Sequence, residues 1–216
     1  KQLLSQFPNS LTLYNIQGIA NAALGQFDAA IDSYKQALKI KPDYADGYYN
    51  MGAALKNKGD LEAAMGSYKQ ALKIKPDYAE AHNNLGVTLQ ELGRLDEADT
   101  SVAQAIALKP GYAEAHNNLG VTLQELGRLD EAEASVTQAI ALKPGYAEAH
   151  NNLGTMLQDL GRIDEAEASY RQAIALKPDY AEAHNSLLKC LYLLDKQSLF
   201  FDKLDYLINE DTANAT

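Results

Sequence analysis

Apolar and small residues recur along this chain with the spacing of an α-helix. In residues 79–112, His82, Leu85, Gly86 and Leu89 follow one another at intervals of three, one and three residues, which places them on one face of a helix. A second stripe of the same kind runs through Leu95, Ala98, Val102, Ala105 and Ile106. The pattern predicts two amphipathic helices, one after the other.

Glycine and proline mark where these helices end. Gly93 follows the first stripe, and glycine is the usual residue just past the C-terminal end of a helix. Pro110 follows the second stripe and disfavours helical backbone at the residue before it. The predicted unit is therefore a helix, a turn and a second helix that packs against the first.

The starts of the first helices carry a weaker signal. Asp77 and Asp179 each precede a Glu by three residues, as in a capping box, so both aspartates are predicted to cap the helix that follows. Gly111 and Gly145 replace that aspartate in two other repeats. Because glycine is only a few tenths of a kcal/mol worse than aspartate as an N-cap, we expect looser but intact joints there.

The two-helix unit repeats every 34 residues. Residues 79–112 and 113–146 have the same sequence except that Asp99, Thr100 and Ala103 become Glu133, Ala134 and Thr137. A fixed period of this size is typical of a solenoid, in which each repeat packs on its neighbours. The six prolines keep the same interval, at Pro8, Pro42, Pro76, Pro110, Pro144 and Pro178.

The period divides the chain into segments. We expect residues 1–10 to end a truncated preceding repeat, so that the chain is a fragment of a longer protein. Five full repeats follow at 11–44, 45–78, 79–112, 113–146 and 147–180. A divergent terminal helix pair is expected at 181–209, and a polar tail or linker at 210–216.

The terminal pair departs from the pattern. Leu188 stands where the other first helices have glycine, and residues 198–209 carry an apolar stripe at Phe200, Leu204, Leu207 and Ile208. This stripe either seals the last repeat or docks against a following domain or a second copy of the chain. The sequence leaves these alternatives open.

The net charge of the chain limits the classes of binding partner that are expected. The formal net charge is −10 and the sequence pI is about 4.8, which argues against nucleic acid because phosphate binding depends on clustered Lys and Arg. No apolar run approaches the roughly 20 residues that span a bilayer, so no membrane partner is expected. No secretory leader opens the chain, and Cys190 has no partner for a disulfide, so we favour the cytoplasm.

The residues that could carry chemistry are isolated from one another. One histidine recurs in each later repeat, but packed helices lie about 8–10 Å apart, too far for equivalent histidines to meet at one zinc ion. No nucleophile recurs beside a base, and no phosphate-binding loop is present. We predict no metal site, no cofactor and no catalysis within this chain. The histidines, expected to pack between the two helices, are His82, His116, His150 and His184.

A polar stripe on the first helices points to binding instead. Packing within a solenoid would leave this stripe facing neither partner helix, yet it is kept in register from repeat to repeat. Its candidate residues are Asn50, Asn83, Asn84, Asn117, Asn118, Asn151, Asn152, Glu80, Glu114, Glu148, Gln90 and Gln124.

Each repeat resembles the tetratricopeptide repeat. The match consists of an aromatic residue or His, then Leu-Gly, Leu, a turn Gly, Ala, Tyr or Val, Ala and Pro in register, over residues 11 to about 195. The Asn-Leu-Gly runs at Asn84, Asn118 and Asn152 are most similar to those of O-linked N-acetylglucosamine transferases and related bacterial chains. The resemblance implies a right-handed superhelix whose concave groove is lined by the polar stripe.

The resemblance also implies a role for the asparagines that precede Leu-Gly or Met-Gly, which are Asn50, Asn84, Asn118 and Asn152. In the transferases this Asn binds the main chain of a peptide, and an amide matches the donor and acceptor groups of any peptide backbone. The alternative is that the asparagines only hydrogen-bond neighbouring repeats or solvent.

The charge of the groove refines the expected ligand. The repeats at 79–112, 113–146 and 147–180 each carry three more acidic than basic residues, whereas the first two are nearly neutral. The glutamates Glu80, Glu114 and Glu148 would favour a basic peptide and speed its encounter with the groove. The alternative is a solvated surface that aids solubility.

Three functions fit these observations. The first is a protein–protein interaction scaffold that binds an extended peptide, favoured if basic, or a partner protein. The second is the substrate-recruiting region of a larger enzyme such as a glycosyltransferase, with catalysis outside these residues. The third is a module that self-associates through its chain ends, where Phe7 and the 198–209 stripe are apolar.

Overall fold

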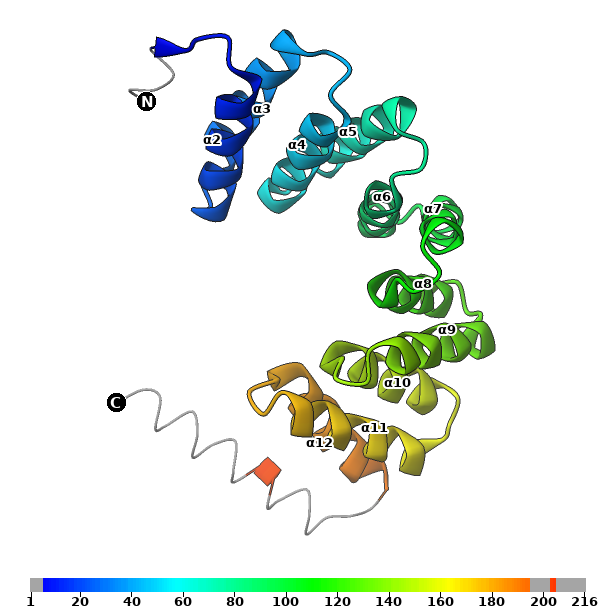
Figure 1. The fold of residues 1–216 in the computed structure, drawn as a ribbon. Helices are drawn as coiled ribbons and strands as arrows, with labels where there is room; N and C mark the ends of the chain where they lie inside the picture. Colours follow the sequence, from blue (N-terminus) through cyan, green and yellow to red (C-terminus); the bar gives the residue numbers. More distant parts are fainter. Residues whose placement is uncertain (1–5, 195–202, 205–216) are drawn as a thin grey trace, which may run out of the picture. The chain divides into compact units, whose positions relative to one another are not determined.

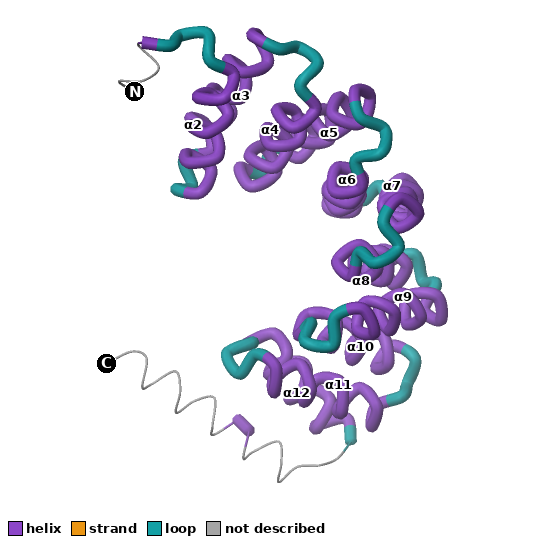
Figure 2. Tube along the Cα trace, viewed as in Figure 1, coloured by secondary structure: helices purple, strands orange, loops and turns teal. Residues whose placement is uncertain are grey.

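The protein is all-α in the part of the chain that the structure describes. A computed structural model describes residues 6–194 and 203–204, and within them eleven named helices follow one another without a strand (Figures 1 and 2). The helices alternate as first and second members of pairs, as the periodicity predicts. The all-α repeat architecture is therefore confirmed. The right-handed superhelix stays a prediction.

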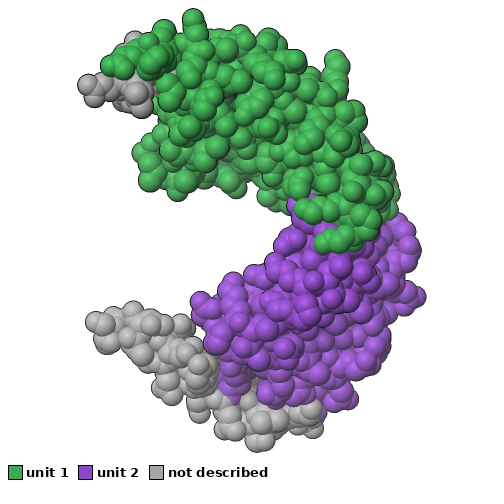
Figure 3. All heavy atoms as spheres, viewed as in Figure 1, with its two compact units in different colours: residues 1–111 green, residues 112–216 purple. Residues whose placement is uncertain are grey.

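The chain divides into two compact units, residues 1–111 and 112–216 (Figure 3). Unit 1 contains three helix pairs, α2 (Leu11–Ala23) with α3 (Phe27–Ile40), α4 (Ala45–Lys58) with α5 (Leu61–Ile74), and α6 (Ala79–Glu91) with α7 (Leu95–Leu108). Unit 2 contains α8 (Ala113–Glu125) with α9 (Leu129–Leu142), α10 (Ala147–Asp159) with α11 (Ile163–Leu176), and α12 (Ala181–Leu193).

The predicted helix ends are confirmed. Gly93 has a φ of +73°, a left-handed conformation that favours glycine, and the N–H of Arg94 then donates to the carbonyl of Leu89 at 2.8 Å. The last residue before Pro110 is extended, because Lys109 has φ −140° and ψ 81°. These local signals fix the two-helix unit before any packing is considered.

The predicted N-caps are wrong. Helix α6 has Tyr78, not Asp77, at its N-cap, and no side chain caps it; α12 likewise has Tyr180 there, not Asp179. The reason is that the helix begins one residue later than the capping-box pattern requires, with the carbonyl of Tyr78 accepting the N–H of His82 at 3.1 Å. A Gly in place of the aspartate therefore leaves the cap unchanged, and the expected loosening has no basis.

The two helices of a pair approach closely at a glycine. A Cβ atom added at Gly52 would lie 2.8–3.0 Å from the ring of Tyr68 on α5, and one at Gly86 would lie 2.3 Å from a methyl carbon of Val102 on α7. Only glycine leaves room for these contacts. Alanines at fixed positions of the second helices, such as Ala64 in α5, are also fully buried.

Each unit curves toward its first helices. In unit 1, α2 contacts α4 and α4 contacts α6; in unit 2, α8 contacts α10 and α10 contacts α12. Among the described helices of either unit, the second helices of consecutive repeats have no Cα atoms within 8 Å of one another. We call the side formed by the first helices the inner face of each unit.

The divergent terminal pair is described only in part. Helix α12 covers its first half, while most of the predicted helix at 198–209, including Phe200, Leu207 and Ile208, lies outside the described residues. Residues Lys203 and Leu204 are helical and half-buried.

Candidate functional site

The inner faces carry a ladder of side-chain amides that joins consecutive repeats. The side-chain N–H of Asn152 donates to the side-chain carbonyl oxygen of Asn117 at 2.9 Å in unit 2, and that of Asn84 donates to the Tyr49 hydroxyl at 3.1 Å in unit 1. Asn50 donates to the equivalent residue of α2 at 3.3 Å. Each donor lies 35 residues after its acceptor, one residue more than the repeat period, so the stacking of consecutive first helices brings the two side chains together.

The ladder separates the predicted binding residues into two rows. Asn83, Asn117 and Asn151 are only 4–5% exposed, so their side chains lie between neighbouring first helices. In the second row, Asn50, Asn84, Asn118 and Asn152 are half-buried and therefore reachable from the inner face. The structure thus brings both rows together on the inner faces, where the first row is buried and only the side chains of the second row are half-buried.

A second set of contacts with the same spacing joins the C-terminal halves of the first helices. Lys56 pairs with Glu91 at 2.8 Å in unit 1. In unit 2, Gln124 donates to the Asp159 carboxylate at 2.6 Å. Gln90 and Gln124 are both half-buried. Lys56 was not among the predicted site residues, although its spacing of 35 residues from Glu91 was readable in the sequence.

The predicted glutamate column is already paired with lysines of the same repeat. Lys109 lies 3.1 Å from Glu80, Lys143 lies 2.9 Å from Glu114, and Glu148 has a lysine at 3.6 Å. A hydrogen bond with its own backbone N–H, followed by that from Lys109, lowers the pKa of Glu80. Each of the three carboxylates therefore already has a lysine ammonium beside it.

The lysines and tyrosines of the interhelical loops form a row next to these glutamates. The ammonium of Lys143 lies 4.4 Å from the ring centre of Tyr146, and that of Lys177 lies 4.8 Å from that of Tyr180. Burial, followed by the nearby glutamate charges, raises the pKa of Tyr146 to about 12. The row of glutamates is therefore bordered by a row of neutral tyrosines and positively charged lysines.

Unit 1 has an aromatic cluster on its inner face that unit 2 lacks at the equivalent position. The ring centre of Tyr49 lies 4.9 Å from that of Tyr78 and 6.0 Å from that of Tyr68. Burial is the main cause that raises the pKa of Tyr49 and Tyr68. Tyr49 occupies the position of Asn117 in unit 2, so the two inner faces differ in chemistry while sharing one backbone pattern.

The histidines stabilise the loops between repeats. The Nε2 atom of His82 lies 3.0 Å from the carbonyl oxygen of Pro76, and that of His150 lies 3.1 Å from that of Pro144. Each ring thus ties the start of a first helix to the turn before it. In the described part of the chain, no group of three or more His, Cys, Asp or Glu residues is arranged to hold a metal ion.

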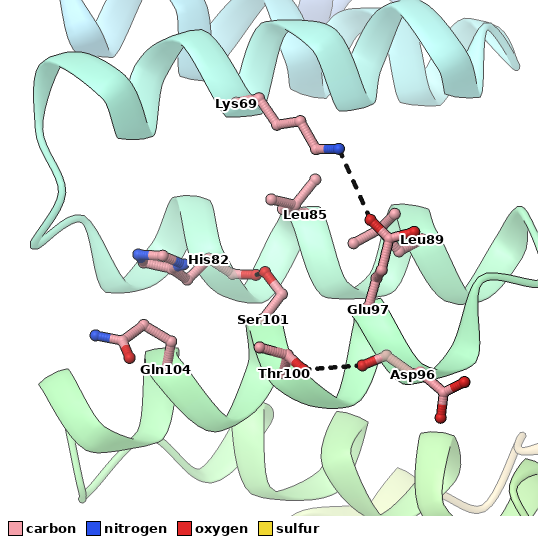
Figure 4. A pocket seen from close by; sticks show the side chains of 9 residues that line it. All are labelled: Lys69, His82, Leu85, Leu89, Asp96, Glu97, Thr100, Ser101 and Gln104. Atoms are coloured by element: carbon pink, nitrogen blue, oxygen red, sulfur yellow. Dashed lines mark hydrogen bonds and ion pairs between the residues drawn. The ribbon is translucent and has the colours of Figure 1, made fainter.

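A pocket missed by the sequence analysis lies on the other side of unit 1. It has a volume of about 600 Å³ and a floor of Leu85 and Leu89 from α6, and Lys69 of α5 faces Glu97 of α7 across it at 3.9 Å (Figure 4). The pocket was missed because its walls come from three helices; they also include His82, Asp96, Thr100, Ser101 and Gln104.

A comparison with protein families gives one match over most of the chain. The model described as the cilia and flagella-associated protein 70 C-terminal domain, a tetratricopeptide domain, matches residues 8–200. A comparison with curated proteins gave no match. The tetratricopeptide prediction is confirmed.

Many solved structures share the fold. MamA is 28% identical, with a TM-score of 0.68 over 80% of this chain and 94% of that one. TTC0263, a tetratricopeptide protein from Thermus thermophilus, is 27% identical, with a TM-score of 0.69 over 85% of this chain and 100% of that one. YrrB, described as a tetratricopeptide protein with an unusual peptide-binding site, is 22% identical, with a TM-score of 0.67 over 86% and 95%.

None of the described helices is both long enough and apolar enough to cross a membrane.

Proposed function

Since this chain belongs to the family of the cilia and flagella-associated protein 70 C-terminal domain, a tetratricopeptide family, we propose that it is a scaffold that binds an extended peptide of a partner protein on its inner faces. Tetratricopeptide scaffolds mediate protein–protein interaction as a class, and YrrB is described as having a peptide-binding site. The observation that carries the proposal is the half-buried row of asparagines at Asn50, Asn84, Asn118 and Asn152.

The ladder holds this row in place. Asn152 uses one N–H on Asn117, and its remaining N–H and its carbonyl oxygen suit a peptide backbone, which offers both acceptors and donors. Because the ladder fixes the side chain before a ligand arrives, less conformational entropy is lost on binding. An amide row of this kind binds main chain and leaves side-chain selection to its neighbours.

The test replaces the four asparagines of the row by alanine. Peptides selected from a random display library against the unmodified protein serve as the probe, and fluorescence anisotropy measures their dissociation constants. We expect affinity to fall at least about tenfold, which corresponds to about 1.4 kcal/mol. The proposal fails if the affinity is unchanged.

A matched control removes the same number of side-chain amides from the second helices instead of the inner face. The glutamines Gln70, Gln104, Gln138 and Gln172 are exposed amides at equivalent positions of the second helices. Their replacement by alanine should leave binding unaltered. An equal loss in this control would place the peptide on the outer side, where Gln104 lines the pocket of unit 1.

A basic residue in the ligand fits the acidity of residues 79–180. Because Lys109 and Lys143 already pair with Glu80 and Glu114, a basic ligand gains from these glutamates only by exchanging with those lysines. We therefore expect the preference for basic peptides to be modest and to weaken as salt is added.

Two more specific functions can each be tested separately. The resemblance of the Asn-Leu-Gly repeats to O-linked N-acetylglucosamine transferases supports a substrate-recruiting region of a larger enzyme, and a catalytic domain in the complete reading frame would establish it. Exposed apolar residues such as Phe7, at 56%, support self-association through the chain ends. Sedimentation at several protein concentrations tests that version.

A further inference from the structure

We propose that unit 1 selects its ligand through a row of apolar side chains, Ile19, Ala53 and Val87, which takes an aliphatic residue of an extended peptide at every third position. Each first helix of the unit, α2, α4 and α6, contributes one residue to this apolar row, and the three residues are one repeat apart. The inference rests on the peptide-binding function proposed above and names the side-chain chemistry of the peptide that unit 1 prefers.

The apolar row lies on the middle of the inner face. Successive residues of a helix are turned by about 100° around its axis, so the side chain of Val87 points between those of Asn83 and Asn84. Asn84 reaches the preceding first helix, where its amide donates to the Tyr49 hydroxyl at 3.1 Å. Tyr49 holds the position of Asn83 in α4, so that position faces the following first helix. A side chain directed between these two faces neither neighbouring helix.

Two polar ladders border the apolar row. One helical turn before it runs the amide ladder, and one turn after it Lys56 of α4 pairs with Glu91 of α6 at 2.8 Å. Between them, Ile19 is 49% exposed, and Ala53 and Val87 are half-buried. Single apolar residues on a surface need no explanation, but here three stand in register on helices that contact one another. They form a continuous apolar strip that a ligand can cover.

The spacing of the first helices sets the period of the ligand. Packed helices lie roughly 8–10 Å apart, so consecutive side chains of the apolar row are separated by about this distance. Alternate residues of a β-strand are only about 6.4–6.8 Å apart, whereas every third residue of a polyproline II helix lies on one side with a spacing of about 9.3 Å. A polyproline II segment therefore places one side chain over each residue of the row.

The same conformation suits the amide ladder. A polyproline II backbone makes no internal hydrogen bonds, so its N–H and C=O groups are free to pair with the amides of Asn50 and Asn84. These asparagines precede Ala53 and Val87 by three residues, and residues three apart are neighbours on the surface of a helix. One segment of ligand can therefore place its main chain on the amides and its aliphatic side chains on the apolar row.

Unit 2 lacks an apolar row at these positions. They are occupied by Val121 in α8, Thr155 in α10 and Lys189 in α12. The hydroxyl of Thr155 donates to the backbone carbonyl of Asn151 at 3.2 Å, and Lys189 is exposed. Because an aliphatic side chain of a ligand would meet polar groups at two of the three positions, the preference for aliphatic residues belongs to unit 1.

Two synthetic peptides of identical length and composition test the period. One carries its three isoleucines at every third position and the other at every second position, with serine and glutamine elsewhere. Fluorescence anisotropy with the full chain measures both dissociation constants. We expect the first peptide to bind at least about fivefold more tightly, because only its isoleucines all reach the row. Equal affinities, or tighter binding of the second peptide, would overturn the period of three.

The same substitution in each unit tests where the selection takes place. Val87→Thr puts a hydroxyl into the apolar row, and Val121→Thr makes the same change in unit 2; threonine already stands at this position in α10. With the peptide of period three, we expect Val87→Thr to weaken binding about fivefold and Val121→Thr by less than about twofold. Thermal melting checks that both variants stay folded. Equal losses would refute a selection confined to unit 1.

A peptide with alanine in place of the isoleucines completes a double-mutant cycle with Val87→Thr. The two changes should cost less together than the sum of their separate costs, because both remove the same contact. Strictly additive losses would show that the isoleucines do not touch the row and would overturn the inference.

Failure of this inference can be told apart from failure of the proposed function. If replacing the Asn row weakens binding and Val87→Thr does not, the peptide function holds and the apolar row is not its selector. If neither the synthetic peptides nor a display library yields a ligand, both are refuted. A dimer of the unmodified chain that dissociates on Val87→Thr, seen by sedimentation, would assign the row to a second copy and also overturn the inference.

Discussion

The second repeat of unit 1 and the first helix pair of unit 2 share one backbone plan and fill it differently. Gly52 in α4 faces Tyr68 in α5, whereas Gly120 in α8 faces Val136 in α9. A Cβ would meet the tyrosine ring at 2.8 Å in the first case and a valine methyl carbon at 2.3 Å in the second. The helices approach closely in both, although the side chains differ greatly in volume.

The volume lost at Val136 is supplied from the next repeat. Met156 of α10 is fully buried, and its terminal methyl carbon would lie 3.4 Å from a Cβ at Gly120. Leu123 and Val136 share its core cluster. At this position, therefore, a side chain of the next repeat fills space that a tyrosine of the same repeat fills in unit 1.

Equivalent positions on the two inner faces also carry different side chains. Tyr49 in α4 and Asn117 in α8 hold the same position, and each accepts a hydrogen bond from the asparagine 35 residues later. A phenol and an amide are thus interchangeable as acceptors in the ladder. The backbone pattern is shared by all repeats, and the chemistry of the binding face is set position by position.

The largest expected difference between the two repeats comes from removing the central side chain of each. Tyr68→Ala should reduce the free energy of unfolding by about 3–5 kcal/mol, because a fully buried aromatic side chain is lost and a cavity is left. Val136→Ala should cost about 2 kcal/mol, since two methyl carbons are lost. Urea unfolding followed by circular dichroism measures both.

Tyr68→Phe serves as the control for the first variant. Its expected change in the free energy of unfolding is within about 1 kcal/mol, because the buried Tyr68 hydroxyl has no hydrogen-bond partner in the described residues. A larger loss from Val136→Ala than from Tyr68→Ala would contradict the idea that Met156 compensates for the smaller residue.

Two glycines of the second repeat, when replaced by alanine, should change the free energy of unfolding by intermediate amounts and in opposite directions. Gly52→Ala should destabilise by about 1–3 kcal/mol, because the new methyl group overlaps the Tyr68 ring. Gly66→Ala, in the interior of α5 with nothing within 4 Å of the added carbon, should stabilise by about 0.5–1 kcal/mol through helix propensity. Thermal melting distinguishes the two, and a shared sign would refute the close-approach role of Gly52.

The smallest expected effect concerns the end of the amide ladder. The side-chain oxygen of Asn151 is buried without a hydrogen-bond partner in the described residues, and Ser186, 35 residues later, is too short to donate as asparagine does elsewhere. Ser186→Asn should therefore stabilise unit 2 by about 0.5–1.5 kcal/mol. Ser186→Ala is the control, and equal stability of the two variants would rule out the missing donor.

The elements of the fold were predictable from local sequence. The turn at Gly93 and the stop at Pro110 depend on residues within one repeat, and these predictions are confirmed. The capping prediction at Asp77 failed because a pattern of four residues does not specify which residue takes the cap conformation. The loop tyrosine occupies that position in each first helix from α4 to α12.

The candidate site was predictable only in outline. The polar stripe was identified, but the burial of Asn83 and the pairing of Glu80 with Lys109 depend on how one repeat or helix is placed against the next. Periodicity predicts which residues occupy equivalent positions, but it does not predict the distances between their side chains. The spacing of 35 residues becomes meaningful only once first helices are known to contact one another.

The hydrogen bonds of the ladder also mean that an inner-face amide can be part of two repeats at once. Asn117 belongs to α8 by sequence, yet its acceptor is occupied by α10. Within a unit, such sharing couples each repeat to its nearest neighbours, as in a one-dimensional lattice in which order propagates from site to site. Opening an end repeat removes a hydrogen-bond partner from the repeat beside it, so each unit loses order from its ends inward.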